Sequence, residues 1–391
     1  MLAKHWRGGG WESGGQMRGV AALLVVVVLG LLAGCGGGTG APSASKPAAA
    51  AASGGGASAP AGGASAAPSG GAASSPLDAL VAAAANEGVF QFYGPSAFSK
   101  PEADRLMAAF NQKYGLNIEY QYTPSGSMTR DTARLITEIS AGQPPSWDLA
   151  MMTDAHYAML HSNDALEKVD WQALGVNPSS ITNDGTSIMA ATTFVAPAYN
   201  PNLVRPEDAL KDWDDLLDPK WRGKMGVSTA THFWARLAQV RGDERMTRFM
   251  EGLAAQEPAL GSLPELYNRV TIGELAVFAA VPDSYWIMAR RSGAPLSIVE
   301  TAKPIIAQQY DLGLLKGARH PNQAKLMAAF IVTPEAQALW EEIQGQSSMY
   351  VEGTTANRYA QGKEIVTLDQ KFGAEQLDQL TEKYGRMVGY R

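Results

Sequence analysis

Residues 89–127, VFQFYGPSAFSKPEADRLMAAFNQKYGLNIEYQYTPSGS, place an amphipathic helix between two apolar strands. The first strand ends at Gly94-Pro95, and a helix is predicted from Pro101 to Tyr114, with Gly115 suited to its left-handed C-terminal end. The second strand is predicted over residues 117–122. Strand, helix and strand joined by short connections predict parallel strands linked by a right-handed crossover, which is the unit of an α/β fold.

The same order continues downstream, with a predicted helix over residues 129–140 and a predicted strand over residues 147–152. Polar side chains follow each strand of this region: Ser96, Ser125, Ser127, Thr153 and Asp154. In open α/β sheets, ligands bind at the carboxyl ends of the strands, and helix N-termini there favour anions. The alternative for each hydroxyl is that it only caps a helix. We therefore expect these residues to line a ligand pocket.

The middle of the chain repeats this pattern. A predicted strand over residues 225–227 leads to Ser228, Thr229 and His232, and a later strand ends at Pro282, just before Ser284 and Tyr285. Two sheets whose polar edges face each other form a cleft, a common ligand site between domains.

The N-terminal region indicates a leader and a tether. Residues 20–32, VAALLVVVVLGLL, are short for a membrane span but suit a signal-peptide core, and Leu32-Ala33-Gly34-Cys35 resembles a bacterial lipobox. That resemblance implies a signal peptide over residues 1–34, with Met1 and Met17 as alternative starts, and lipid on Cys35. Residues 36–75 are almost entirely small or Pro, so we expect residues 35–76 to form the lipidated Cys and a disordered tether.

Composition excludes several classes of function. The net charge of −6 argues against a nucleic-acid partner, and a single Cys allows neither an internal disulfide nor a thiolate metal site. The chain contains no GxxxxGK[ST] loop and no G-x-S-x-G nucleophile elbow. We therefore expect no enzymatic activity and no required cofactor.

Six phrases carry a family resemblance: EGVFQFYG, AAFNQKYG, AGQPPSWDL, AYNPNLVRPEDALKDWDDLLDPKWRGKMGV, GELAV and LLKGARHPNQAKLMAAFIVTPEAQALW. Together they are similar to periplasmic solute-binding proteins of ferric-iron and related ABC importers, and the stretch from Trp213 to Gly223 is the most specific. The resemblance implies a two-lobed, type 2 venus-flytrap fold of the α/β class, with a hinge of two or more crossings near residues 193–199 and 303–312.

The resemblance also implies domain boundaries and partners. Lobe one would comprise residues 77–196 and lobe two residues 197–305, and residues 306–391 would return to lobe one and add C-terminal helices. Ligand binding would close the lobes, and a membrane permease with its ATPase would receive the solute. The protein would act as a monomer in the cell envelope, held at the outer surface or in the periplasm by the lipid.

The ligand is left open between two classes. In iron-binding members of the family, two adjacent tyrosines bind Fe³⁺, and the resemblance places that pair on Ser284 and Tyr285, so Tyr285 is the candidate metal ligand. Tyr199, Tyr267 and His232 are further candidates for a ferric site. The alternative is a phosphonate, a sugar phosphate or a carboxylate held by the hydroxyl-rich loops, with Asp154 or Asp283 facing any cationic group of the ligand.

Two other functions fit the same features. One is a ligand-sensing accessory lipoprotein that reports to a membrane signalling partner, and the other is a lipoprotein hydrolase. Turnover of esters or phosphoesters would indicate the hydrolase, and identification of the membrane partner would separate sensing from transport.

Overall fold

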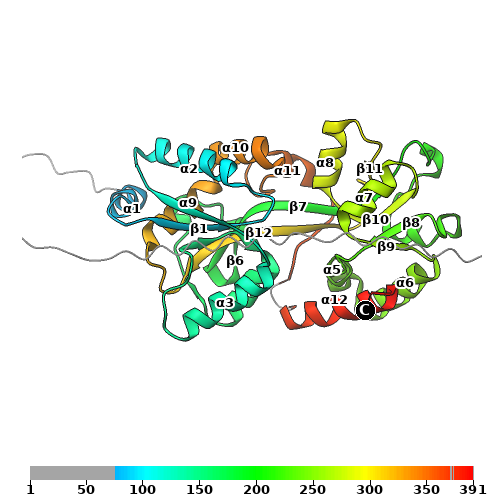
Figure 1. Ribbon diagram of the computed structural model, residues 1–391, viewed down its shortest axis with the longest axis horizontal. Coiled ribbons are helices and arrows are strands. Elements are labelled where there is room, and N and C mark those ends of the chain that lie inside the picture. The colour runs from blue at the N-terminus through cyan, green and yellow to red at the C-terminus, as the bar shows by residue number, and fades with distance from the viewer. Residues whose placement is uncertain (1–74, 370–371, 373, 391) are drawn as a thin grey trace, which may run out of the picture. The chain divides into compact units, whose positions relative to one another are not determined.

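The computed structural model describes residues 75–369, 372 and 374–390, and the predicted leader, the lipid site at Cys35 and most of the tether lie outside them. Strands and helices alternate along the first part of the chain, as the sequence predicts (Figure 1). The elements up to residue 182 are α1 (Pro76–Ala84), β1 (Phe90–Gly94), α2 (Lys100–Tyr114), β2 (Tyr120–Pro124), α3 (Met128–Ser140), β3 (Leu149–Ala150), β4 (Met152–Thr153), α4 (Asp154–Ser162), β5 (Leu166–Glu167) and β6 (Ile181–Thr182).

Local signals set the ends of these helices. The Ser75 and Asp78 side chains form a capping box at the start of α1, and Gly115 ends α2 with a left-handed φ of 64°. β1, β2 and β3 pair in parallel in the order β2-β1-β3, which confirms the predicted crossover arrangement. The predicted strand over residues 147–152 is instead two short strands, β3 and β4, which pair with different neighbours.

Two long strands link the halves of the folded region. β7 (Ser187–Tyr199) and β12 (Ile305–Leu315) run antiparallel, and their register extends from Gly313 opposite Ser187 to Ile306 opposite Val195. The predicted hinge segment 193–199 lies within β7, and the segment 303–312 begins two residues before β12 and continues along it. At its start β7 pairs with β6, and at its end it pairs with β10 (Val277–Pro282) and β11 (Ser297–Ile298).

The remaining elements complete the two halves. They are β8 (Met225–Ser228), α5 (His232–Arg241), α6 (Asp243–Ala255), β9 (Ala259–Gly261), α7 (Leu263–Thr271), α8 (Asp283–Ser292), α9 (Pro321–Ile331), α10 (Pro334–Gln344), α11 (Thr355–Ala360), β13 (Ile365–Val366) and α12 (Ala374–Val388). We call the elements from α1 to β6, with α9 and α10, the first half. The second half comprises β8 to β11, α5 to α8, and α12.

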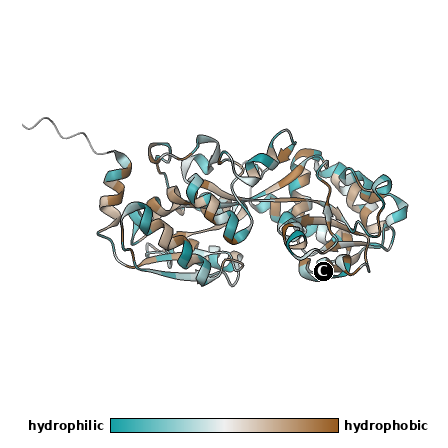
Figure 2. Ribbon diagram, turned by 90° about the horizontal axis from the view of Figure 1, so that it is seen from above, coloured by the Kyte–Doolittle hydropathy of each residue, from teal (hydrophilic) through white to brown (hydrophobic). Residues whose placement is uncertain are grey.

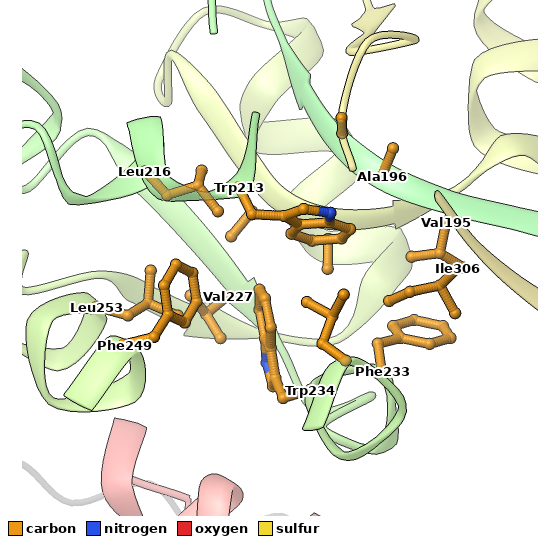
Figure 3. Packing of buried hydrophobic residues seen from close by; sticks show 14 of the residues in the cluster. Val195, Ala196, Trp213, Leu216, Val227, Phe233, Trp234, Phe249, Leu253 and Ile306 are labelled. Atoms are coloured by element: carbon orange, nitrogen blue, oxygen red, sulfur yellow. The ribbon is translucent and has the colours of Figure 1, made fainter. Parts of the chain in front are cut away.

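Each half has its own core. Phe90, Phe110 and Phe330 belong to a cluster of the first half, whereas Trp213 and Trp234 belong to a cluster of the second. The edges and faces of the two Trp rings meet with centroids 5.8 Å apart, and Phe249 packs on Trp234 (Figure 3). Hydrophilic and hydrophobic residues alternate along the helices of both halves (Figure 2), as expected for helices that cover a core on one face.

The C-terminal helix packs on the second half. Leu377, Leu380 and Tyr384 of α12 join the core cluster that contains Trp213. Lys383 Nζ and Tyr384 Oη donate to Asp243 of α6, at 2.6 and 2.8 Å. The lobe boundaries expected from the sequence stay predictions, and α12 contacts α5 and α6 of the second half as well as α4 of the first.

Candidate functional site

The loops after β1 and β2 lie next to each other. Gly94 and Pro124 are paired at the ends of the two strands, and Ser125 N donates to Gly94 O over 2.9 Å. Ser96 is exposed, and Ser127 is the N-cap of α3, where its hydroxyl accepts from Arg130 N. The structure therefore brings Ser96, Ser125 and Ser127 to one edge of the sheet, with a capping role for Ser127.

Asp154 has a partner that its sequence context does not indicate. The Arg236 guanidinium, from α5, donates to both carboxylate oxygens of Asp154 at the start of α4, over 2.5 and 2.8 Å. Both side chains are nearly inaccessible, with 1% of Arg236 and 9% of Asp154 exposed. Asp154 was expected to face a cationic group of a ligand, and in the structure its charge is already compensated by Arg236. The pair joins a helix of the first half to a helix of the second.

Neighbouring polar groups surround this pair. Thr153 Oγ1 lies 2.7 Å from His156 Nδ1, and His232 Nε2 lies 3.1 Å from Gln308 Oε1. Burial, reinforced by the Arg236 charge, lowers the pKa of His232 to about 4, so its imidazole is neutral at pH 7. Burial, together with the Asp154 charge, raises the pKa of Asp311 well above its usual range. Asp311 Oδ1 is buried without a hydrogen-bond partner.

The loop after β8 lies at the start of α5. Ser228 is buried in the strand, whereas Thr229 is exposed and its N–H donates to Gly261 O over 3.1 Å. Because β8 and β10 are parallel neighbours, Ser228, Thr229 and His232 follow the same edge of the sheet as Ser284 and Tyr285 of α8.

Tyr199 does not belong with this group. It pairs with Val277 at the beginning of β10, whereas Ser284 and Tyr285 follow the opposite end of that strand at Pro282. Five residues of strand separate the two ends, about 17 Å at roughly 3.4 Å per residue. The structure therefore places Tyr199 and Tyr285 at opposite ends of β10, and a role of Tyr199 in ligand binding stays a prediction.

Tyr285 is half-buried against a second phenol. Its ring centroid lies 5.4 Å from that of Tyr267 in α7, and burial raises the pKa of the Tyr285 phenol. Among the described residues, no group of three or more His, Cys, Asp or Glu side chains is arranged to hold a metal ion. Tyr285, the strongest candidate for a ferric ligand, therefore has no such group beside it among the described residues.

A cavity of about 420 Å³ lies between α8, α10, α11 and β7. Its lining includes Asp283, Trp286, Arg290, Arg291, Gln346 and Tyr359. The sequence marks Asp283 as a possible partner for a ligand cation, but nothing in it places α10 and α11 beside α8. Apart from Asp283, none of the predicted site residues lines this cavity.

Residues 90–343 match the bacterial extracellular solute-binding protein family. The chain belongs to this family. As a solute-binding protein it shares its fold with iron-bound HitA from Pseudomonas aeruginosa, with a TM-score of 0.63 and 19% identity over 76% of this chain and 99% of HitA. The fold confirms the predicted two-lobed α/β architecture.

Other solute-binding proteins are similarly close in fold. The Trichodesmium protein IdiA (FutA), in complex with iron and citrate, has a TM-score of 0.62 and 18% identity over 78% of this chain and all of its own. AfuA from Actinobacillus pleuropneumoniae, with fructose-6-phosphate bound, has a TM-score of 0.61 and 18% identity over 77% of this chain and 98% of its own. Their ligands differ, so the shared fold does not select a ligand.

A curated relative from Haemophilus influenzae, an uncharacterized protein, is 29% identical over 198 residues. The match covers 46% of this solute-binding protein and 55% of the relative. Within the described residues, no helix combines the length and the apolar character needed to cross a bilayer.

Proposed function

We propose that this protein is the substrate-binding lipoprotein of an ABC importer, which captures a small anionic solute or a ferric complex between its two halves and delivers it to a membrane permease. The observation that carries the proposal is the buried Asp154–Arg236 pair, which joins α4 of one half to α5 of the other. Since each half has its own core and β7 and β12 link them, this contact defines a closed arrangement that can open around the two strands.

Helix starts on both halves support an anionic solute. α3, α4, α5 and α8 each begin directly after a strand or a strand-end loop, and the free N–H groups of a helix start attract negative charge. Hydroxyls of Ser125, Thr229 and Ser284 follow those strands and supply further donors. We propose Ser96, Ser127, Thr153, Ser228 and His232 as the surrounding residues.

An organic anion is favoured over ferric iron. A trivalent ion requires several anionic oxygens, and the Asp154 carboxylate is already paired with Arg236. The relatives include proteins with iron and one with fructose-6-phosphate, so both ligands occur on this fold. Tyr285 with Tyr267 would be the phenols to consider if the transported ligand is Fe³⁺.

Thermal unfolding of the purified protein with each candidate ligand tests the proposal. Inorganic phosphate, fructose 6-phosphate and ferric citrate are the probes, and a ligand present at a hundred times its Kd should add about 2.7 kcal/mol of stability. Ser284→Ala and Tyr285→Ala should weaken the shift, whereas Arg248→Gln, on the exposed side of α6, should leave it unchanged. Unchanged affinity in both loop variants would show that the solute does not bind at this edge.

Lipid attachment at Cys35 is a separate part of the proposal. Metabolic labelling with a fatty acid should mark the wild-type protein and leave Cys35→Ser unlabelled. Cross-linking in membranes identifies the partner: a permease supports transport, whereas a signalling protein would support the sensing role instead.

A further inference from the structure

The cavity between α8, α10 and α11 has the size of a small-molecule site. Its volume of about 420 Å³ falls in the range of roughly 300–1,000 Å³ that is usual for ligand pockets. α8 belongs to the second half and α10 to the first, and Figure 1 shows the three helices next to one another along one edge of the molecule. A molecule in this cavity would contact both halves.

Aromatic side chains from three elements form its walls. The ring centroids of Phe194, from β7, and Tyr359, from α11, lie 4.6 Å apart, and Trp286 lines the cavity from α8. Flat rings with accessible faces suit a flat apolar body.

Two polar atoms in this lining lack partners. Asp283 Oδ1 and Tyr359 Oη are both buried and form no hydrogen bond within the described part of the chain. Buried polar atoms are seldom left unpaired, because each costs about 1–3 kcal/mol. Two such atoms in one cavity lining indicate that a bound molecule supplies the missing partners, with a donor for Asp283.

Two arginines of the cavity lining form no ion pair among the described residues. Arg290 and Arg291 line it and form no ion pair or hydrogen bond with a described residue; Arg290 lies over the Trp286 ring, 5.0 Å from its centroid. The two glutamates of the lining have partners outside the arginine pair, since Glu341 accepts from Thr355 N and Glu342 pairs with Arg105. An anionic group would find two guanidinium groups available.

We propose that this cavity is a second binding site, distinct from the strand-end loops, for a small organic anion with a flat apolar ring and a hydrogen-bond donor. Arg290 and Arg291 hold the anionic group, Trp286 and Phe194 contact the ring, and Asp283 accepts from the donor. The inference does not depend on the proposed transport function, because none of the loop residues lines the cavity.

Calorimetric titration of the full-length protein with 4-aminophenyl phosphate tests the inference. Phenyl phosphate lacks the donor and inorganic phosphate lacks the ring, so both serve as comparison probes. We expect 4-aminophenyl phosphate to bind with a Kd below about 1 mM and inorganic phosphate at least about tenfold more weakly. Phenyl phosphate should fall between them.

Variants locate the binding. The double variant Arg290→Gln/Arg291→Gln, at exposed positions, should raise the Kd at least about tenfold, and Arg248→Gln is the matched control. Tyr359→Phe removes only the buried hydroxyl whose missing partner the bound molecule would supply. It should therefore lower the affinity and preserve the fold. Ser125→Ala and Tyr285→Ala should leave it unchanged.

Three results would overturn the inference. The first is that 4-aminophenyl phosphate does not bind at a concentration of about ten times the expected Kd. The second is that inorganic phosphate binds with the same affinity as 4-aminophenyl phosphate. The third is that the arginine double variant binds 4-aminophenyl phosphate with the affinity of the wild type. If binding is lost only in the Ser125 and Tyr285 variants, the anion sits at the loops; the second site is then wrong, while the proposed transport function stands.

Discussion

At the scale of single residues, Arg236 and Asp154 matter most, because they form a buried ion pair between the two halves. A buried ion pair offers modest net stability, but removal of one partner leaves an uncompensated charge. The sequence places Asp154 at a strand end, yet it cannot show Arg236, which lies 82 residues away and pairs only through the approach of α4 and α5.

Arg236→Met should destabilise the fold by about 3–5 kcal/mol, because it leaves the Asp154 carboxylate buried beside Asp311. The double variant Arg236→Met/Asp154→Asn should recover a large part of that loss. Urea denaturation followed by circular dichroism measures both, with Arg248→Met as the exposed control. A single variant as stable as the wild type would contradict the role of the pair.

Asp283 should make stability depend on pH in a defined direction. Burial raises the pKa of this carboxyl to about 7, against hydrogen bonds from Phe194 N and Ser284 N that lower it. Since the unfolded pKa is near 4, the folded state binds the extra proton between about pH 4 and pH 7. The stabilising contribution is therefore complete below about pH 4 and is lost as the pH rises towards about 7.

The difference between the wild type and Asp283→Asn isolates this contribution. His232 acts in the opposite sense, because its pKa is lowered to about 4, but it is common to both proteins and cancels. Thermal unfolding at about pH 4.5 and pH 7.5 should show the wild type losing stability relative to the variant, by the order of 1–3 kcal/mol. A difference that is constant with pH would contradict the raised pKa.

At the scale of elements, capping and turn residues in the sequence predicted where helices and strands begin and end. Gly115 ends α2 as expected, and capping boxes form at Ser75 and at Asp212. Sheet direction and helix docking could not be predicted in the same way, because they depend on contacts between distant segments. The position of Tyr199 relative to Tyr285 and the cavity beside α11 are two features that the local sequence does not show.

Asp243 should hold α12 on the second half. It accepts hydrogen bonds from Lys383 and from Tyr384, whose ring is fully buried. Asp243→Ala leaves the Tyr384 hydroxyl without this acceptor, so α12 should loosen by about 1–2 kcal/mol. Hydrogen–deuterium exchange should become faster over residues 377–388 and stay unchanged in α2. Asp104→Ala, an exposed carboxylate of the first half, is the control for a general effect.

At the scale of the whole folded region, the family resemblance predicted the two-lobed architecture correctly. The separate core of each half explains why. The matched phrases mark strand ends and helix starts of both halves, and those local patterns persist at low identity. The site is less predictable than the fold, because the ligand contacts depend on how far the two halves approach each other. The Asp154–Arg236 pair fixes that approach in the structure described here.

Closure should therefore respond to solute. Ser96 and Thr229 are exposed and lie on opposite halves, so spin labels at Ser96→Cys and Thr229→Cys, in a Cys35→Ser background, report the separation of the loops. Without solute we expect a broad distribution of distances between the two spin labels. Saturating solute should shift this distribution to one short distance, because only the closed form contacts the solute from both sides. Arg236→Met should shift the solute-free distribution towards longer distances. Identical distributions with and without a solute of proven affinity would show that the halves do not close on their ligand.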